Sequence, residues 1–340
     1  MRDSHPTSTA IRPSPTSFVF RLAGSLRLGA LAGTLVGLTL ALWLLHSYGT
    51  ARIVAVLTRA GLFGTLAVIA IHLPQMLCSA LGWQAVAAPA RSRPPLRTLL
   101  WLRWIREAVN NLLPLAQVGG EFVAARLLQR RGVPLAQGIA GTIADLMMEM
   151  ATQVVFTVLG LWLLVQATGH SSLSATAGRA LLLAAIGIAL AFALIRAGAV
   201  RLLETAALKM GKAFGWPATA QISGLHDALT GCLRSPVAVS GAGLWHLASW
   251  ILGGAEVCLA LHYFGHDTSF APGLVIESLG QASKSAGFAV PGALGVQEGG
   301  YLVVCHLLGI PAETALALSL IKRLREVVLG VPALLIWRYH

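Results

Sequence analysis

Acidic residues stand at two matched places in the chain, where their surroundings suggest chemistry. Glu121 and Glu298 each follow a glycine-containing bend, and each stands near a glutamine, Gln117 or Gln297. An acid in the first turn of a helix is favoured by the helix dipole, so capping is the simple interpretation of either one. Because the pattern occurs twice, we favour a polar site whose helix N-termini hold a phosphate or another anionic group.

Further polar and charged residues fall inside apolar stretches, where a charge costs roughly 3 kcal/mol even on lenient insertion scales. For headgroup binding we select Asn110, Asn111, Gln117, Glu121, Lys284, Gln297, Glu298 and Arg323. For gating ion pairs or a proton relay we select Glu107, Asp145, Glu149, Lys322, Arg325 and Glu326. The alternative hypothesis is that these charges only neutralise one another and clamp the helices together.

Special residues recur at a constant offset of 177 (291 − 114). The matched pairs are Pro114 and Pro291, Glu121 and Glu298, Gly132 and Gly309, Pro134 and Pro311, and Glu149 and Glu326. The same offset places Lys284 opposite Glu107 and Lys322 opposite Asp145, so the repeats carry complementary charges. We therefore predict an internal repeat with ion pairs that cross between its copies.

The elements that position these residues are long apolar stretches. The chain is 56% hydrophobic and 11% charged, with a mean hydropathy of +0.73, whereas a soluble domain is about one-quarter charged. Six stretches approach or exceed the roughly 20 residues of a spanning helix. They are residues 28–45, 62–81, 138–165, 179–195, 237–261 and 315–337. Without the alternation of barrel strands, they predict an all-α polytopic membrane bundle with about six spanning helices.

Charge distribution predicts the topology. Residues 1–25 are polar and predicted to be a disordered cytoplasmic segment, and residues 26–340 a single membrane domain. The basic residues that flank 99–131 predict a hairpin that enters from the cytoplasm and turns back. Three spans separate it from a second hairpin, so the halves, about 99–165 and 273–340, form an inverted repeat. Both termini are then cytoplasmic, in a bacterial inner membrane.

Other features exclude several functional classes. The net charge of +12 is typical of cytoplasmic loops in a membrane protein, and no nucleic-acid motif accompanies it. Four cysteines without CxxC spacing predict neither a disulfide framework nor a metal site, and we expect no cofactor. His72 and His246 lie in apolar helices and are interpreted as packing residues. Residues 199–212 are interpreted as an interfacial helix or an ordinary amphipathic connector.

Two strings carry a family resemblance. Asn110-Asn111-Leu112-Leu113-Pro114 with Gly119-Gly120-Glu121, followed by Gly132-Val133-Pro134 and Asp145, resembles the lysylphosphatidylglycerol synthase transmembrane-domain family. The string from Phe288 to Gly300 is closer to the hopanoid-biosynthesis-associated branch of that family, HpnL. The likeness covers roughly residues 25 to 337.

The resemblance implies a function in lipid transport. In the multiple peptide resistance factor, this membrane domain moves aminoacylated phospholipid between leaflets, while a separate soluble domain synthesises that lipid. This chain ends at His340, directly after its last helix, so we expect no aminoacyltransferase activity and no enzyme. We predict a translocator or handling protein for a phospholipid or hopanoid. The alternatives are a non-catalytic scaffold for hopanoid biosynthesis proteins and an intramembrane lipid-modifying enzyme. The oligomeric state stays open.

Overall fold

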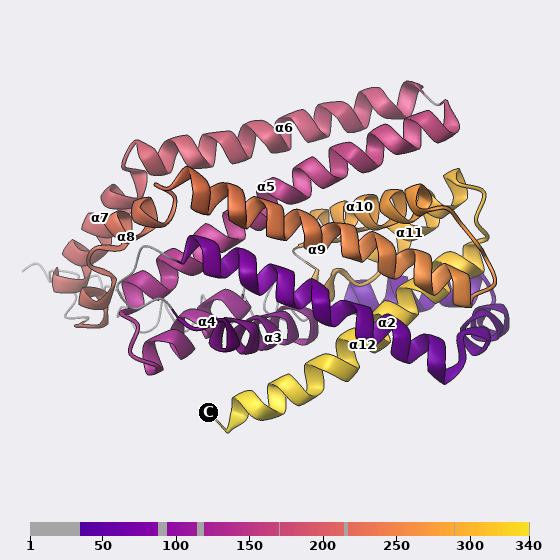
Figure 1. The fold of residues 1–340 in the computed structure, drawn as a ribbon, viewed down its shortest axis with the longest axis horizontal. Helices are drawn as coiled ribbons and strands as arrows, with labels where there is room; N and C mark the ends of the chain where they lie inside the picture. The colour runs from indigo at the N-terminus through magenta and orange to yellow at the C-terminus, as the bar shows by residue number, and fades with distance from the viewer. Residues whose placement is uncertain are drawn as a thin grey trace, which may run out of the picture.

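The structure is a computed structural model that describes residues 35–87, 94–113, 119–169, 171–213, 217–288 and 290–339. Within these ranges every regular element is a helix and none is a strand (Figure 1). The predicted all-α class is confirmed. The polar segment 1–25 lies outside the described residues, so its predicted disorder stays a prediction.

The helices follow one another with short connections. The first described helix is Leu35–Ser47. The α-helices that follow are α2 (Thr50–Val86), α3 (Leu96–Leu112), α4 (Gly119–Arg130), α5 (Leu135–Thr168), α6 (Ser171–Arg196), α7 (Ala199–Ala213), α8 (Leu225–Cys232), α9 (Pro236–Tyr263), α10 (Phe270–Ala286), α11 (Val296–Leu307) and α12 (Ala312–Arg338). Two short 3₁₀ helices, η1 (Pro217–Ile222) and η2 (Pro291–Ala293), complete the set.

Three helices, α2, α5 and α9, are long and apolar enough to cross a membrane. A fourth span results if the end of α6 and the start of α7, bent by 61°, count as one. All six predicted apolar stretches fall largely within helices, although α12 carries four charged side chains near its middle. Large apolar side chains such as Leu62 and Phe63 point outward, as expected for a surface that faces lipid.

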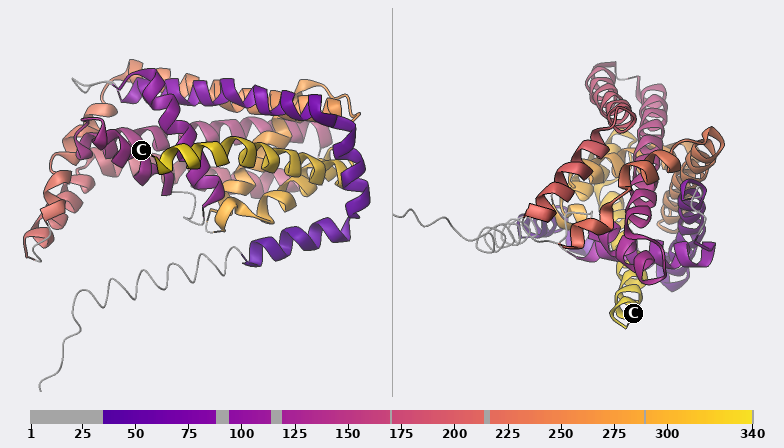
Figure 2. Two further views of the ribbon diagram at one scale, coloured as in Figure 1. Left: turned by 90° about the horizontal axis from the view of Figure 1, so that it is seen from below. Right: turned by 90° about the vertical axis from the view of Figure 1, so that its left-hand side faces the viewer.

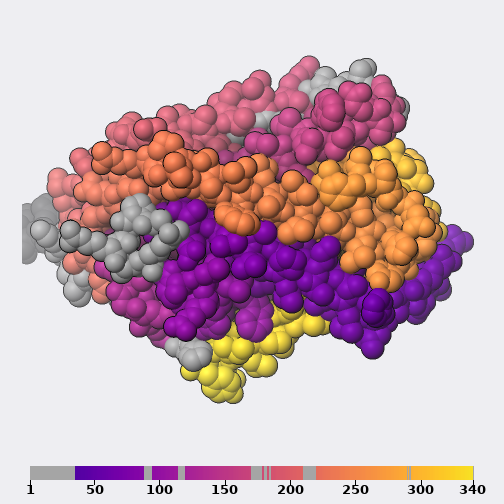
Figure 3. Space-filling view, viewed as in Figure 1, coloured from indigo at the N-terminus to yellow at the C-terminus, as the bar shows by residue number. Residues whose placement is uncertain are grey.

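Helices α2 and α9 pack closely along the bundle and run in opposite directions (Figure 1). They lie side by side across the face seen in Figure 3. Small residues permit the close approach, because a Cβ atom on Gly64 would lie 2.7 Å from the Tyr263 ring and one on Gly82 would lie 2.9 Å from His246. At the crossing, the Gln75 side-chain nitrogen lies 3.5 Å from the carbonyl oxygen of Leu252, a residue 177 positions later.

Two helical hairpins occupy opposite ends of the bundle (Figure 1). In the first, α3 packs against α4, and in the second, α10 packs against α11. The bounds of α4 and α11 differ by 177 residues, as do the starts of α5 and α12. The turns between them also agree. The Val133 N–H donates to the Leu128 carbonyl at 3.1 Å, and the Ile310 N–H donates to the Cys305 carbonyl at 2.8 Å.

The glycine that precedes each of these two bonds adopts a left-handed conformation, with φ of 88° at Gly132 and 72° at Gly309. Glycine takes such values without a steric penalty, whereas most residues do not. A proline follows two residues later in both turns and begins the next long helix. The repeat offset predicted from the sequence therefore matches the local backbone geometry of the two turns.

The long helix of each half packs against the hairpin of the other half. Helix α5 contacts α10, and α12 contacts α3, so the first arm of each hairpin packs against the long helix of the other half. Helices α5 and α12 run in opposite directions (Figures 1 and 2). Helix Leu35–Ser47 covers the turn before α11, where a Cβ atom on Gly37 would lie 2.8 Å from the Val290 side chain. Helices α7 and α8 lie at one end of the molecule (Figure 1).

Candidate functional site

Charged and polar side chains from eight helices, buried or partly buried in the bundle, form a group of neighbouring clusters, here called the buried network. Its members each make a direct polar contact with at least one other member. They are His72, Gln75, Arg103, Arg106, Glu107, Glu121, Asp145, Glu149, His246, Glu256, Glu277, Lys284, Glu298, Lys322, Arg323, Arg325 and Glu326. A charge at such depth is tolerated only when it is paired or faces a polar cavity.

In the first half, two arginines of α3 hold the acids together. Arg103 donates to Glu149 with both terminal nitrogens, at 2.9 and 2.7 Å, and its Nε donates to Glu107 at 2.8 Å. Arg106 donates to Glu149 at 2.7 Å, and it also pairs with Asp145. The fork of a guanidinium group suits this role, because its five N–H donors can serve several carboxylates in fixed directions.

The same arginine reaches the tip of the first hairpin. Arg106 Nε donates to Glu121 at 3.0 Å, and the Asn110 side-chain amide donates to the same carboxylate at 3.2 Å. The Asn110 oxygen in turn accepts a bond from the Gly120 N–H at 2.8 Å. Asn110 therefore ties the end of α3 to the start of α4, and Glu121 is already satisfied by groups of its own hairpin.

Two histidines on the central helices contact the carboxylates of the first half. The Nε2 atom of His246 lies 2.9 Å from Asp145, and both side chains are almost fully buried. The Nε2 atom of His72 lies 3.1 Å from Glu107, and its Nδ1 atom lies 3.3 Å from Gln75. Each histidine has polar partners in the buried network, so the interpretation of both as packing residues stays a prediction.

The crossing of α2 and α9 connects the two halves of the network. The Gln75 amide donates to Glu256 at 2.7 Å, and Glu256 also pairs with Arg325 of α12. Nδ1 of His72 lies 3.9 Å from the same carboxylate. A chain of polar contacts thus runs from His246 through the first half to Arg325.

In the second half, cations of α12 meet acids of α9, α10 and α11. Lys322 pairs with Glu277. Glu326 accepts bonds from Lys284 at 2.8 Å and from Arg323 at 3.1 Å. Arg323 also lies 3.3 Å from Glu298. Lys322 with Glu277 and Lys284 with Glu326 join α12 to α10, whereas Arg323 links α12 to α11 and to Glu326 of its own helix.

The tips of the two hairpins meet beside this second cluster. Lys284 donates to the Asn111 side-chain oxygen at 3.1 Å, which links α10 to the end of α3. A Cβ atom on Gly292 would lie 3.3 Å from the Asn111 carbonyl and 3.5 Å from Arg323 Nη1. A small cavity of about 20 Å³, large enough for about one water molecule, lies between His72, Glu107 and Arg325.

Two buried polar atoms at this meeting point have no hydrogen-bond partner among the described residues. They are Nη2 of Arg323 and Oε1 of Gln297. Buried polar groups are nearly always paired in folded proteins. Among the described residues, this donor of α12 and this acceptor of α11 are exceptions to that rule.

The structure places the predicted headgroup residues around these tips, with one exception. Gln117 lies outside the described residues, so its predicted contact stays a prediction. Glu298 accepts a bond from the Gly295 N–H at 2.7 Å and from the Ser319 hydroxyl at 2.9 Å, which matches the capping interpretation. The roles assigned to the other headgroup and gating residues likewise stay predictions.

The predicted ion pairs between repeats are wrong in their partners. Glu107 pairs with Arg103 rather than Lys284, and Asp145 pairs with Arg106 rather than Lys322. The reason is local, because α3 presents two arginines within one turn of Glu107. A contact between the halves comes instead from Lys284 with Asn111, while Arg325 pairs with Glu256 of α9, which lies outside both halves.

Several network members were not selected from the sequence. They are His72, Gln75, Arg103, Arg106, His246, Glu256 and Glu277. The signal for Glu256 was present, since it is an acid inside the apolar stretch 237–261. The repeat does not reveal Glu256 or Glu277, because the offset pairs them with Ser79 and Leu100.

In the described part of the chain, no group of three or more His, Cys, Asp or Glu residues is placed to hold a metal ion. All four cysteines are free. Burial of Cys232 in α8 raises the pKa of its thiol to about 11, so this thiol resists ionisation at neutral pH.

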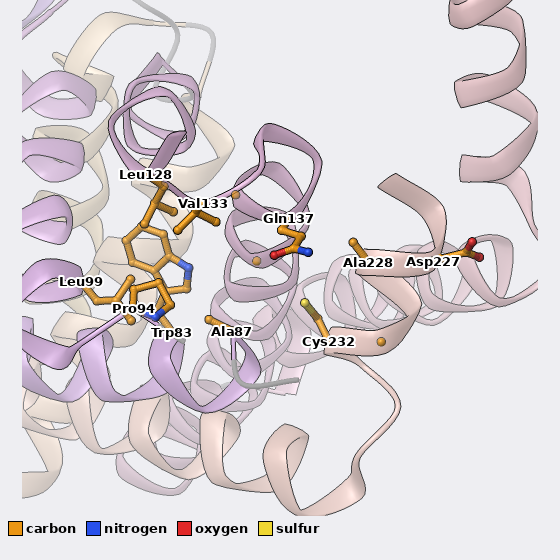
Figure 4. A pocket seen from close by; sticks show the side chains of 13 residues that line it. Trp83, Ala87, Pro94, Leu99, Leu128, Val133, Gln137, Asp227, Ala228 and Cys232 are labelled. Carbon is orange, nitrogen blue, oxygen red and sulfur yellow. The ribbon is translucent and has the colours of Figure 1, made fainter. Parts of the chain in front are cut away.

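A larger pocket lies at the end of the bundle near α8 (Figure 4), and its residue Trp83 has the network residue Arg106 over its ring, 5.5 Å from the centroid. Its volume is about 200 Å³, and its walls come from α2, α4, α5 and α8. Trp83, Leu128 and Val133 lie on one side, with Gln137 and Cys232 across from them (Figure 4). The Nε1 atom of Trp83 has no hydrogen-bond partner among the described residues. No feature of the sequence indicated this pocket.

Comparison with known families identifies the chain. The family model for the lysylphosphatidylglycerol synthase TM region matches residues 30–333, which include both hairpins and every member of the buried network. The chain belongs to this family. No curated protein and no solved structure matches it. Membership in the lysylphosphatidylglycerol synthase TM family, together with the apolar helices, supports a multi-pass membrane protein with a lipid-related function.

Proposed function

We propose that this protein moves a lipid between the leaflets of its membrane. The headgroup would pass through the polar region where the hairpin tips meet, while the apolar part stays in the surrounding lipid. The observation that carries the proposal is that Nη2 of Arg323 and Oε1 of Gln297 have no hydrogen-bond partner among the described residues. Family membership supplies the lipid context.

The chemistry of these groups suits a phosphate-containing headgroup. A guanidinium group binds phosphate oxygens through charge-assisted hydrogen bonds, which are roughly twice as strong as neutral ones. Nη2 of Arg323 is such a donor, without a partner in the described part of the chain, and Lys284 lies nearby with the Asn111 amide. A headgroup amine or hydroxyl would find an acceptor in the unpaired Gln297 oxygen.

The arrangement of the halves suggests how access would alternate. We propose that the two hairpins are re-entrant and form an inverted repeat within about six spans. The opposite directions of α5 and α12, the hairpins at opposite ends, and the shared turn geometry support it. Each hairpin would then open toward one side of the membrane, and breaking one set of ion pairs would release the headgroup to that side.

The same proposal includes the location of the protein and the lipid that it moves. We place the protein in a bacterial inner membrane with both termini in the cytoplasm, as the arginine distribution suggests. The second hairpin string resembles the hopanoid-associated branch, so a hopanoid or a phospholipid handled alongside hopanoids is the proposed cargo. The lipid would cross without chemical change, so the protein is not proposed to be an enzyme.

Leaflet exchange in proteoliposomes tests this function. Purified protein is reconstituted with a phospholipid that carries a fluorescent label on its headgroup, and a membrane-impermeant reductant bleaches only the outer leaflet. We expect the protected fraction to fall from about half toward zero with wild-type protein. Arg323→Gln is expected to slow this loss, whereas Arg201→Gln, in an exposed ion pair on α7, serves as the matched control.

The alternatives give different results in the same preparations. A scaffold would leave the protected fraction unchanged for every phospholipid and hopanoid offered. A lipid-modifying enzyme would produce a lipid of changed mass, detectable by mass spectrometry of the extracted vesicles. Either result would contradict translocation.

A further inference from the structure

We propose that His72 and His246 form a proton-binding site of the buried network and exchange about two protons during each transport cycle. The role in transport rests on the proposed function, whereas proton binding itself does not. The inference comes from the charge balance of the network and from the contacts of the two imidazoles.

The network holds two more carboxylates than permanent cations. Its eight carboxylates belong to Glu107, Glu121, Asp145, Glu149, Glu256, Glu277, Glu298 and Glu326. Its six lysine and arginine cations belong to Arg103, Arg106, Lys284, Lys322, Arg323 and Arg325. Two uncompensated charges in a buried site are costly, so the arrangement favours the uptake of positive charge.

The imbalance lies in the first half. In the second half, with Glu256 of α9 counted beside its partner Arg325, four acids meet four cations, whereas in the first half four acids meet only Arg103 and Arg106. Both histidines of the network contact carboxylates of that first half. The two histidines, which can gain a positive charge, therefore lie beside the uncompensated carboxylates.

His246 is held against one acid and its arginine partner. Its Nε2 atom faces Asp145 of α5 at 2.9 Å, and Asp145 also pairs with Arg106 of α3. Glu149 of α5 interacts electrostatically with the same imidazole. The His246 ring also packs against Gly82 of α2, where an added Cβ atom would lie only 2.9 Å from the ring.

His72 stands between the two halves of the network. Its Nε2 atom faces Glu107 of α3, and Nδ1 lies 3.3 Å from Gln75 and 3.9 Å from Glu256 of α9. The cavity of about 20 Å³ brings Arg325 and Glu326 of α12 to the same space. His72 thus lies near Glu107 of α3 and Glu256 of α9, and Arg325 lies across a gap about the size of a water molecule.

Imidazole is the side chain best suited to exchange these protons. Arginine remains protonated throughout, whereas histidine ordinarily changes charge between about pH 5 and 8. A proton taken from water on one side binds a free ring nitrogen, and the imidazolium is stabilised by the adjacent carboxylate. When movement of the hairpins separates the ring from Glu107 or Asp145, that stabilisation is lost and the proton leaves to water on the other side.

Histidine NMR in lipid nanodiscs tests the site directly. The full chain is labelled with isotopes in its histidines, and ring signals are assigned with His72→Gln and His246→Gln. The signals are followed between about pH 5 and 8, where an ordinary imidazole changes charge, and each single variant is expected to take up about one proton fewer than wild type. His226→Gln, which removes a buried histidine of α8 outside the network, is expected to leave both titrations unchanged.

Two results would overturn the proposal. Ring signals that stay in one protonation state across this range would show a fixed structural pair. Unchanged proton uptake in the double variant would place the protons on other groups. The leaflet-exchange rate should depend on pH in wild-type protein and lose that dependence in the double variant. If no lipid moves in any preparation, the proposed function fails, whereas the NMR titration still decides whether the site binds protons.

Discussion

The two halves share a backbone plan but exchange the positions of their charges. In the first half the hairpin arm α3 carries the cations Arg103 and Arg106, and the long helix α5 carries the acids. In the second half the long helix α12 carries the cations, and the hairpin arm α10 contributes the acid Glu277. A repeat can therefore keep its turns and helix bounds while its polar chemistry diverges, provided that the charges still find partners.

The kind of cation also differs between the halves. Arg106 serves Glu121, Asp145 and Glu149, whereas Lys322 directly contacts only one carboxylate, Glu277. A guanidinium group fixes several partners in defined directions, while an ammonium group acts as a compact point charge. The first half is thus a cluster crosslinked by Arg106, whereas Lys322 and Glu277 of the second half form a simple pair. The following predictions test this difference.

Removal of Arg106 is expected to have the largest effect. The change Arg106→Met leaves three buried carboxylates without a shared partner, so the free energy of unfolding should fall by about 3–5 kcal/mol. Denaturant titration in a mild detergent measures this loss. The control Arg201→Met, which removes an exposed ion pair, should change stability by less than about 0.5 kcal/mol. Equal effects of the two changes would contradict a crosslinked cluster.

The space around one glycine in each hairpin predicts a second, smaller difference in stability between the halves. A Cβ atom on Gly120 would lie 2.4 Å from the Arg106 backbone carbonyl, which cannot rotate away. Gly120→Ala should therefore cost about 1–3 kcal/mol in thermal or chemical unfolding. The matched change Gly299→Ala, in the first turn of α11, meets open space and should be neutral or stabilising. A harmless Gly120→Ala would show that the first hairpin is packed more loosely than described.

Removal of both partners of one pair should have the smallest net effect. Lys322→Met and Glu277→Gln each leave a buried charge alone, whereas the double variant removes both charges. The double variant should therefore lie closer to wild type in unfolding free energy than either single variant. The corresponding double change Arg106→Met with Asp145→Asn should not recover stability, because Glu121 and Glu149 still lack Arg106. Recovery of stability in both double variants would contradict the difference between the halves.

The sequence predicted the backbone plan better than the contacts of the site. Glycine and proline fix turns locally, so the matched strings at Gly132 and Gly309 were enough to locate equivalent helices. Partner choice depends on which face each helix turns toward its neighbours, which an offset between repeats does not determine. Asp145 consequently pairs with Arg106 and His246 rather than with Lys322. The offset also gave no sign of Glu256 or Glu277, since each is an acid in one half only.

The side of the membrane reached by each hairpin is the most direct test of the central claim, that the halves are inverted. Gln129 and His306 are equivalent positions near the turns that follow α4 and α11. Each is replaced by cysteine in a chain whose four native cysteines are changed to alanine, and intact cells are treated with a membrane-impermeant maleimide. The account predicts that His306→Cys is labelled in intact cells and Gln129→Cys only after permeabilisation. Labelling of both from the same side would contradict it.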